Sequence, residues 1–420
     1  MSFQQGLSGL NATSKNLEII GNNIANSNTF GAKVSRGEFS DAYANALNGA
    51  GANSVGIGTA LAAVSQQFTQ GNITATSNPM DLAISGPGFF EVSDGLSPAL
   101  YSRNGQFKVN RDGFIVNNAG LRLIGYPADG TGVIQPGNAS PLQLPSAGIA
   151  PQATTEIQIE MNLDSRVATT APTAGPAIDF NDPTTYNNAT SLAVYDAKGQ
   201  DVALTYYFQK AGTDTWNVFV TANGTPVNGT LLAPVATTTI NFPANGSAPT
   251  APVGPVAFDI PATTNSVGAL TLPINGMLLD LDGARQFGAG FGVTNLTQDG
   301  YAPGQLTGIN FEANGIVMAR YSNGQTKPAG QIELATFRNP QGLQPQGGNA
   351  WARSFASGEP IIGVAGQGNL GVLQSGALEE SNVDLTAELV SMITAQRIYQ
   401  ANAQTIKTQD QVLQTLVNLR

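Results

Sequence analysis

The last part of the chain constrains its fold most strongly. Residues 381–420 contain neither glycine nor proline, whereas the whole chain carries 49 glycines and 24 prolines. Apolar or small residues recur there at alternating spacings of four and three, the heptad pattern of a helix that packs along another helix. At a rise of about 1.5 Å per residue, such a helix is roughly 55–60 Å long and needs a partner along its length. The repeat comprises Leu385, Leu389, Met392, Gln396, Tyr399, Ala403, Ile406, Asp410, Leu413 and Val417.

The N-terminal segment repeats the same spacing, so we expect the two ends of the chain to pair. Its repeat comprises Phe3, Leu7, Leu10, Ser14, Leu17, Gly21 and Ile24. Because polar or small residues interrupt both repeats, an isolated pair is marginal in water, and we expect it to become ordered only when many copies pack together. The pattern alone equally allows an ordinary amphipathic helix on the protein's own core. The predicted assembly seam consists of Leu7, Leu10, Leu17, Ile24, Leu385, Leu389, Met392, Tyr399, Ile406, Leu413 and Val417.

Between the ends, short runs of strand-forming residues alternate with turn dipeptides such as Asn104-Gly105 and Asp112-Gly113. Such dipeptides supply the positive φ angles of tight hairpins, which predicts β structure. The predicted fold is mainly β with long terminal α-helices, built from nested, discontinuous domains. These are a helical coiled-coil pair (1–28 and 378–420), an extended connector (29–70), a first β domain of barrel or sandwich type (71–147 and 291–377) and an inserted outer β domain (148–290).

Composition excludes several functions. The chain has no Cys and no His, which removes thiol nucleophiles, imidazole bases and the usual zinc ligands. Charged residues make up 11% and the net charge is −10, with no basic stripe, so a nucleic acid partner is not expected. Asp280 and Asp282 resemble a fragment of a calcium loop but lack its other ligands, which indicates a turn. We expect no enzyme activity, no metal and no cofactor.

The sequence contains no recognisable signal for secretion or for insertion into a membrane. The N-terminus lacks the basic and apolar regions of a secretory signal peptide, and no apolar run approaches the length of a membrane span. By targeting signals alone, the chain would be cytoplasmic. We expect no insertion into a membrane.

The polar face of the C-terminal segment is rich in uncharged amides. Such a surface suits the wall of a channel, because it stays hydrated without binding a passing chain by charge. Simple exposure to solvent is the alternative. The candidate channel-lining residues are Gln396, Gln400, Gln404 and Gln411.

Three segments resemble the rod and hook family of bacterial flagellar axial proteins. They are GLSGLNATSKNLEIIGNNIANSNTFGAKVSR near the start, NPMDLAISGPGFFEV in the first β domain, and the final stretch from GALEESNVDLTAELV to the C-terminus. Together the similar parts cover both flanks, roughly half of the chain, while residues 148–290 carry little resemblance. Rod members are shorter and lack a large central insertion, so the length of this chain favours a hook-type member.

The resemblance implies a subunit that leaves the cell unfolded through the flagellar type III export apparatus, without a cleaved signal peptide. It would then polymerise outside the cell, which overrides the cytoplasmic prediction. It implies a curved, flexible tube that acts as a universal joint, with the C-terminal helix lining the channel. The implied partners are copies of itself and the flagellar rod, hook cap and hook-filament junction proteins. Alternatives are a distal rod or other axial protein, a secreted β-rich adhesin and, least favoured, a cell-wall enzyme.

Overall fold

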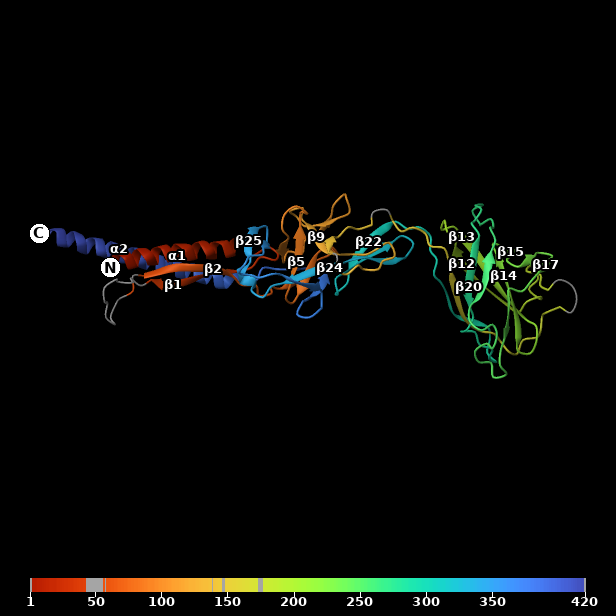
Figure 1. The fold of residues 1–420 in the computed structure, drawn as a ribbon. Helices are drawn as coiled ribbons and strands as arrows, with labels where there is room; N and C mark the ends of the chain where they lie inside the picture. Colours follow the sequence, from red (N-terminus) through yellow and green to blue (C-terminus); the bar gives the residue numbers. More distant parts are fainter. Residues whose placement is uncertain are drawn as a thin grey trace. The chain divides into compact units, whose positions relative to one another are not determined.

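The computed structural model describes residues 2–42, 56, 58–137, 139–145, 148–172 and 177–418. The chain is mainly β with a long helix at each end, as predicted from the sequence (Figure 1). It divides into two compact units. The first contains residues 1–146, 308–320 and 326–420, and the second contains 147–307 and 321–325.

The two terminal helices are α1 (Ser2–Ala25) and α2 (Leu385–Asn418). Asp384 caps α2, because its Oδ1 accepts hydrogen bonds from the backbone N–H groups of Thr386 at 2.9 Å and Ala387 at 3.1 Å. This cap fixes the start of the helix at Leu385. The residues before it form a strand and a short link to the β structure.

A β-hairpin lies beside α1 where sequence analysis expects only an extended connector (Figure 1). Its strands are β1 (Ser35–Ala42) and β2 (Gly58–Gln66), which pair antiparallel with a bulge between Glu38 and Phe39. Residues 43–55 and 57 of the expected connector lie outside the described residues. The segment is rich in Gly, Ala and Ser, so its strands have few of the β-branched and aromatic residues that make strands recognisable.

The β part of the first unit centres on a large sheet, in which β24 pairs with both β5 and β9. Its main core joins Leu82, Phe90, Ile115, Leu123 and Leu334, while a smaller aromatic cluster forms around Trp351. The elements of this part are β3 (Ile73–Ala75), β4 (Leu82–Ser85), β5 (Phe89–Ser93), β6 (Leu100–Ser102), β7 (Lys108–Val109), β8 (Ile115–Val116), β9 (Arg122–Pro127), β10 (Ser140–Pro141), β22 (Leu306–Phe311), β23 (Ile316–Tyr321), β24 (Thr326–Thr336), the 3-10 helix η1 (Pro340–Gly342), β25 (Gln344–Gly347), β26 (Ala350–Ala352), β27 (Ile361–Val364), β28 (Val372–Ser375) and β29 (Ala377–Glu379).

The second unit is a β-sandwich, because one core is shared by a four-stranded sheet, β19-β20-β11-β21, and a five-stranded sheet built on β12, β13 and β14. β21 pairs with β11, so this unit continues beyond residue 290. Its strands are β11 (Glu156–Asn162), β12 (Asn188–Tyr195), β13 (Asp201–Lys210), β14 (Thr215–Ala222), β15 (Thr225–Pro226), β16 (Gly229–Thr230), β17 (Ala233–Pro234), β18 (Thr238–Asn241), β19 (Val256–Ile260), β20 (Ile274–Asp280) and β21 (Gly292–Gln298).

Candidate assembly surface on the terminal helices

The two terminal helices run antiparallel and approach closely at two glycines of α1. A Cβ atom on Gly6 would lie 3.0 Å from Ile406 Cγ1, and a Cβ atom on Gly9 would lie 2.9 Å from Asn402 Nδ2. Glycine leaves room for the neighbouring side chains at both points. The early residues of α1 therefore lie against the later part of α2 (Figure 1).

The more buried face of α2 keeps the four-three spacing, but in a different register from the predicted one. Ala395 is buried, whereas Met392, Asn402 and Ile406 are half-buried and Tyr399 is 39% exposed. Met392, Tyr399 and Ile406 belong to both registers. At the positions between these three, the buried residue is the one immediately before the predicted seam residue. One residue corresponds to a rotation of about 100° around the helix, so Leu389 is turned away from this face, whereas Met392 and Ile406 remain on it.

Three leucines of the predicted seam are exposed on α2. Leu385 and Leu389 are each 45% exposed and Leu413 is 54% exposed. The side chain of Val417 lies outside the described residues. Several exposed apolar side chains along one helix indicate contact with another molecule. The other exposed aliphatic side chains of the helix are Val390, Ile393, Ile398 and Val412.

The predicted N-terminal seam is also displaced from the most buried face of α1. Leu7 is 46% exposed, and Leu10, Leu17 and Ile24 are half-buried. The buried positions are largely small or polar and fall one residue earlier in the repeat. They are Gly6, Thr13, Ile20 and Asn23.

The candidate channel-lining amides are exposed in the structure. Their side chains lie on α2 away from its buried face. In the single chain, this uncharged surface is therefore in contact with solvent. The residues are Gln396, Gln400, Gln404 and Gln411.

Asn23 links three elements, and sequence analysis does not identify it as a functional residue. Its Nδ2 donates to the backbone oxygen of Ser35 in β1 at 2.8 Å and to Glu388 Oε1 of α2 at 3.2 Å. Its Oδ1 accepts a hydrogen bond from the backbone N–H of Ser35 at 2.9 Å. The hairpin and both helices therefore meet at one buried amide.

A buried ion-pair network joins the terminal helices to the β part of the first unit. Glu379, in β29 just before α2, accepts hydrogen bonds from Lys33 Nζ at 2.6 Å and Arg103 Nη1 at 3.1 Å. Lys33 follows α1 in the chain and Arg103 follows β6. The Lys33 and Glu379 side chains are fully buried, and that of Arg103 is 5% exposed. We call these three residues the joint triad.

The joint triad holds two cations for one carboxylate in an environment that is poor in water. Burial lowers the pKa of Lys33, an effect that the neighbouring Glu379 carboxylate opposes. Burial likewise lowers the pKa of Arg103. Lys33 Nζ also donates to the backbone oxygen of Thr69 at 2.8 Å, and Arg103 Nη2 donates to that of Gly86 at 2.9 Å. These carbonyls help to compensate the excess positive charge.

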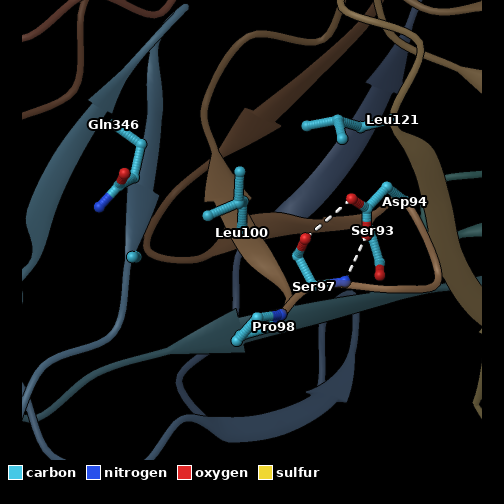
Figure 2. A pocket seen from close by; sticks show the side chains of 8 residues that line it. Ser93, Asp94, Ser97, Pro98, Leu100, Leu121 and Gln346 are labelled. Atoms are coloured by element: carbon cyan, nitrogen blue, oxygen red, sulfur yellow. Dashed lines mark hydrogen bonds between the residues drawn. The ribbon is translucent and has the colours of Figure 1, made fainter.

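A hollow of about 370 Å³ lies in the first β unit (Figure 2). Its walls include Leu100, Leu121 and Pro98, with Asp94 at one side. Asp94 Oδ1 accepts hydrogen bonds from the backbone N–H groups of Leu96 and Ser97, so its carboxylate is occupied within its own turn. These hydrogen bonds lower the pKa of Asp94, that from Ser97 most strongly. The lining therefore offers no acid and base pair for catalysis.

Within the described ranges, no helix combines the length and apolar character needed to cross a membrane. Over the same residues, no group of three or more acidic side chains is arranged to hold a metal ion.

We expect Ile406→Asp to separate the helical pair, because the charge would lie beside Gly6 where the helices approach closely. Far-UV circular dichroism should show a loss of helix with the β contribution retained. Lys407→Asp changes an exposed neighbour and should leave the helical signal intact. An unchanged spectrum for Ile406→Asp would show that this contact does not hold α1 against α2.

Family models match the chain along most of its length. They are the flagellar basal body rod protein model (residues 3–33), the FlgE/F/G D1 domain model of flagellar hook proteins (83–166), the FlaE D2 domain model of flagellar basal body proteins (162–301) and the C-terminal model of the basal body rod FlgEFG proteins (374–419). The chain is 42% identical over 422 residues to the flagellar hook protein FlgE of Escherichia coli strain K12, and the match covers all of both chains. The chain belongs to the FlgE family of flagellar hook proteins.

More distant hook proteins also match the chain. The FlgE protein of Rhizobium meliloti is 34% identical, covering 100% of this chain and 98% of its own. A crystal structure of the Helicobacter pylori hook protein FlgE2 covers 73% of this chain and 100% of its own, with a TM-score of 0.54 and 16% identity, and supports the fold alone. The chain is a structural subunit of the flagellar hook, within the polymer of flagellar axial proteins, and is not an enzyme.

Proposed function

We propose that copies of this chain assemble into a curved, flexible helical tube that acts as a universal joint and transmits torque from the basal body to the filament. The observation that carries the proposal is the set of exposed apolar side chains along α2, among them Leu385, Leu389 and Leu413. A tube built from many copies covers these side chains without requiring any other partner. We also propose that the predicted assembly seam forms contacts between neighbouring copies and sets the register between them.

The proposed tube has concentric layers. The terminal helical domain (1–28 and 378–420) forms the inner wall, with Gln396, Gln400, Gln404 and Gln411 toward the channel. The β part of the first unit and the β-sandwich of the second unit form the outer layers. Bending during rotation requires outer contacts that exchange readily, and a chain with only 11% charged residues suits small, polar interfaces.

The proposal includes specific partners and a route to the cell surface. The rod would adjoin one end of the tube, and the hook cap and hook-filament junction proteins would act at the other. The subunit would leave the cell unfolded through the flagellar type III export apparatus, without a cleaved signal peptide, and would function outside the cell.

Assembly of the purified full-length chain tests the proposal. At high protein and salt concentration, we expect tubes in electron micrographs, and we expect none from a chain that ends before Leu385. In a bacterium that lacks its own hook protein, the full chain should restore motility and the truncated chain should not. A stable monomer that never forms tubes, together with motility that does not depend on α2, would instead favour a secreted binding protein.

A further inference from the structure

Two glutamates face one another across the large sheet of the first unit. β24 and β5 pair antiparallel with Leu334 opposite Phe90 and Ala335 opposite Phe89. The next pair in this register is Glu333 and Glu91. Side chains at directly opposite positions have Cβ atoms about 4.5–5.5 Å apart, and two like charges there repel each other. The register therefore brings two carboxyl groups together on one face of the sheet.

These carboxyl groups lie in an apolar setting. Glu333 is 1% exposed and Glu91 is half-buried. Alternation along the strands places them on the same face as Phe89 and Ala335, within the aromatic cluster that also contains Trp351. The Oε2 atoms of both glutamates are buried without a hydrogen-bond partner. Two unsatisfied, buried oxygens on neighbouring carboxyl groups call for a shared partner.

The surrounding groups do not neutralise the negative charge of the two glutamates. Tyr126 of β9 makes a side-chain hydrogen bond with Glu333. Tyr101 of β6, which is paired opposite Glu91, is an uncharged phenol at neutral pH. The cation that acts on Glu91 is Arg353, which itself forms an ion pair with Glu359. Among the described residues, no cation acts on Glu333.

We propose that Glu91 and Glu333 share one proton in mildly acidic solution, and that loss of this proton as the pH rises weakens the first unit. A proton between two carboxyl oxygens replaces charge repulsion with a short hydrogen bond and satisfies both buried atoms. The described residues offer only two carboxylates here, fewer ligands than a metal ion requires, so a proton is the favoured partner.

Burial, and then the charge of Glu91, raises the pKa of Glu333 to about 7, and burial also raises the pKa of Glu91. In the unfolded chain, both groups return to the ordinary range of about 4.3. Stabilisation by the proton is therefore fully present below that range and is lost as the pH rises through about 7. The chain has no His and no Cys, so few other groups titrate near neutral pH.

Urea unfolding of the full chain tests the proposal. The chain has two tryptophans, so Trp216→Phe leaves Trp351 as a fluorescent reporter of the first unit. In this background we expect a lower urea midpoint at about pH 8 than at about pH 5.5, and Glu333→Gln should remove most of the difference because an amide cannot ionise. Glu312→Gln alters an exposed glutamate of the same unit and should leave the difference unchanged.

Infrared spectroscopy of the unmodified chain provides an independent test that does not depend on how the variants fold. A protonated, buried carboxyl group should give a C=O absorption at about pH 6 that disappears at about pH 9. Absence of this absorption at pH 6, or a pH dependence that persists in Glu333→Gln, would overturn the proposal. So would recovery of the pH 8 midpoint on adding calcium or magnesium, because the pair would then bind a cation.

Discussion

Changing Leu389 and Leu413 together to aspartate should abolish tube formation while leaving the single subunit folded. Both side chains are about half exposed, at 45% and 54%. An exposed substitution typically changes the free energy of unfolding by less than about 0.5 kcal/mol. In the proposed tube the same positions are covered, and an unpaired charge buried at an interface costs about 2–5 kcal/mol. Every subunit carries this cost, so assembly should fail completely.

Electron microscopy and circular dichroism together separate assembly from folding. The matched control is Leu389→Met with Leu413→Met, which keeps both side chains apolar and should still form tubes. If the aspartate variant forms normal tubes, these leucines do not lie between subunits. If it loses its helical and β signals as a monomer, the two leucines stabilise the fold of the single chain instead.

Replacing Glu379 with alanine should strongly destabilise the first unit. Lys33 and Arg103 would then remain buried without a carboxylate, because the side chains of the joint triad are at most 5% exposed. Removing one member of a buried ion pair typically costs about 3–5 kcal/mol. Urea unfolding followed by Trp351 fluorescence measures this loss. Glu18→Ala is the comparison, because its exposed pair with Lys15 is worth only about 0–1 kcal/mol.

A second substitution tests whether the loss comes from uncompensated charge. Adding Lys33→Met to Glu379→Ala should restore part of the stability, because one of the two buried cations is removed along with the carboxylate. If Glu379→Ala is no more harmful than Glu18→Ala, the joint triad does not hold the helices to the β unit. If Lys33→Met gives no recovery, the loss reflects packing around Glu379 and not charge.

Local features of the sequence predicted the terminal helices and the β-rich interior. The heptad spacing and the absence of glycine and proline after residue 380 are properties of a short window, and they favour helix locally. The turn dipeptide Asp112-Gly113 likewise favours a hairpin locally, and it connects β7 to β8 with Gly113 at a φ of 85°. The expectation for Asn104-Gly105 was wrong, because β6 pairs with β5 and β26 and forms no hairpin with β7. Segments recognisable as flagellar then indicated the family, which relatives matching the full chain confirmed.

Contacts between distant residues were not predictable in this way. The hairpin of β1 and β2 has few strand-favouring residues, and its position depends on α1 and on Asn23. The joint triad and the Glu91–Glu333 pair unite residues more than 200 positions apart. Nothing in the sequence distinguishes these charged residues from others. They acquire a role only because the fold buries them beside one another.

By itself, the sequence determined that the ends of this chain are helical, that its interior is β and that it belongs with flagellar axial proteins. Only the tertiary structure decided the register of the helical pair. A heptad pattern identifies an apolar stripe, but Gly6 and Gly9 let Ile406 and Asn402 approach α1 closely. That close approach turns Leu389 outward, because packing depends on shape as well as on hydrophobicity.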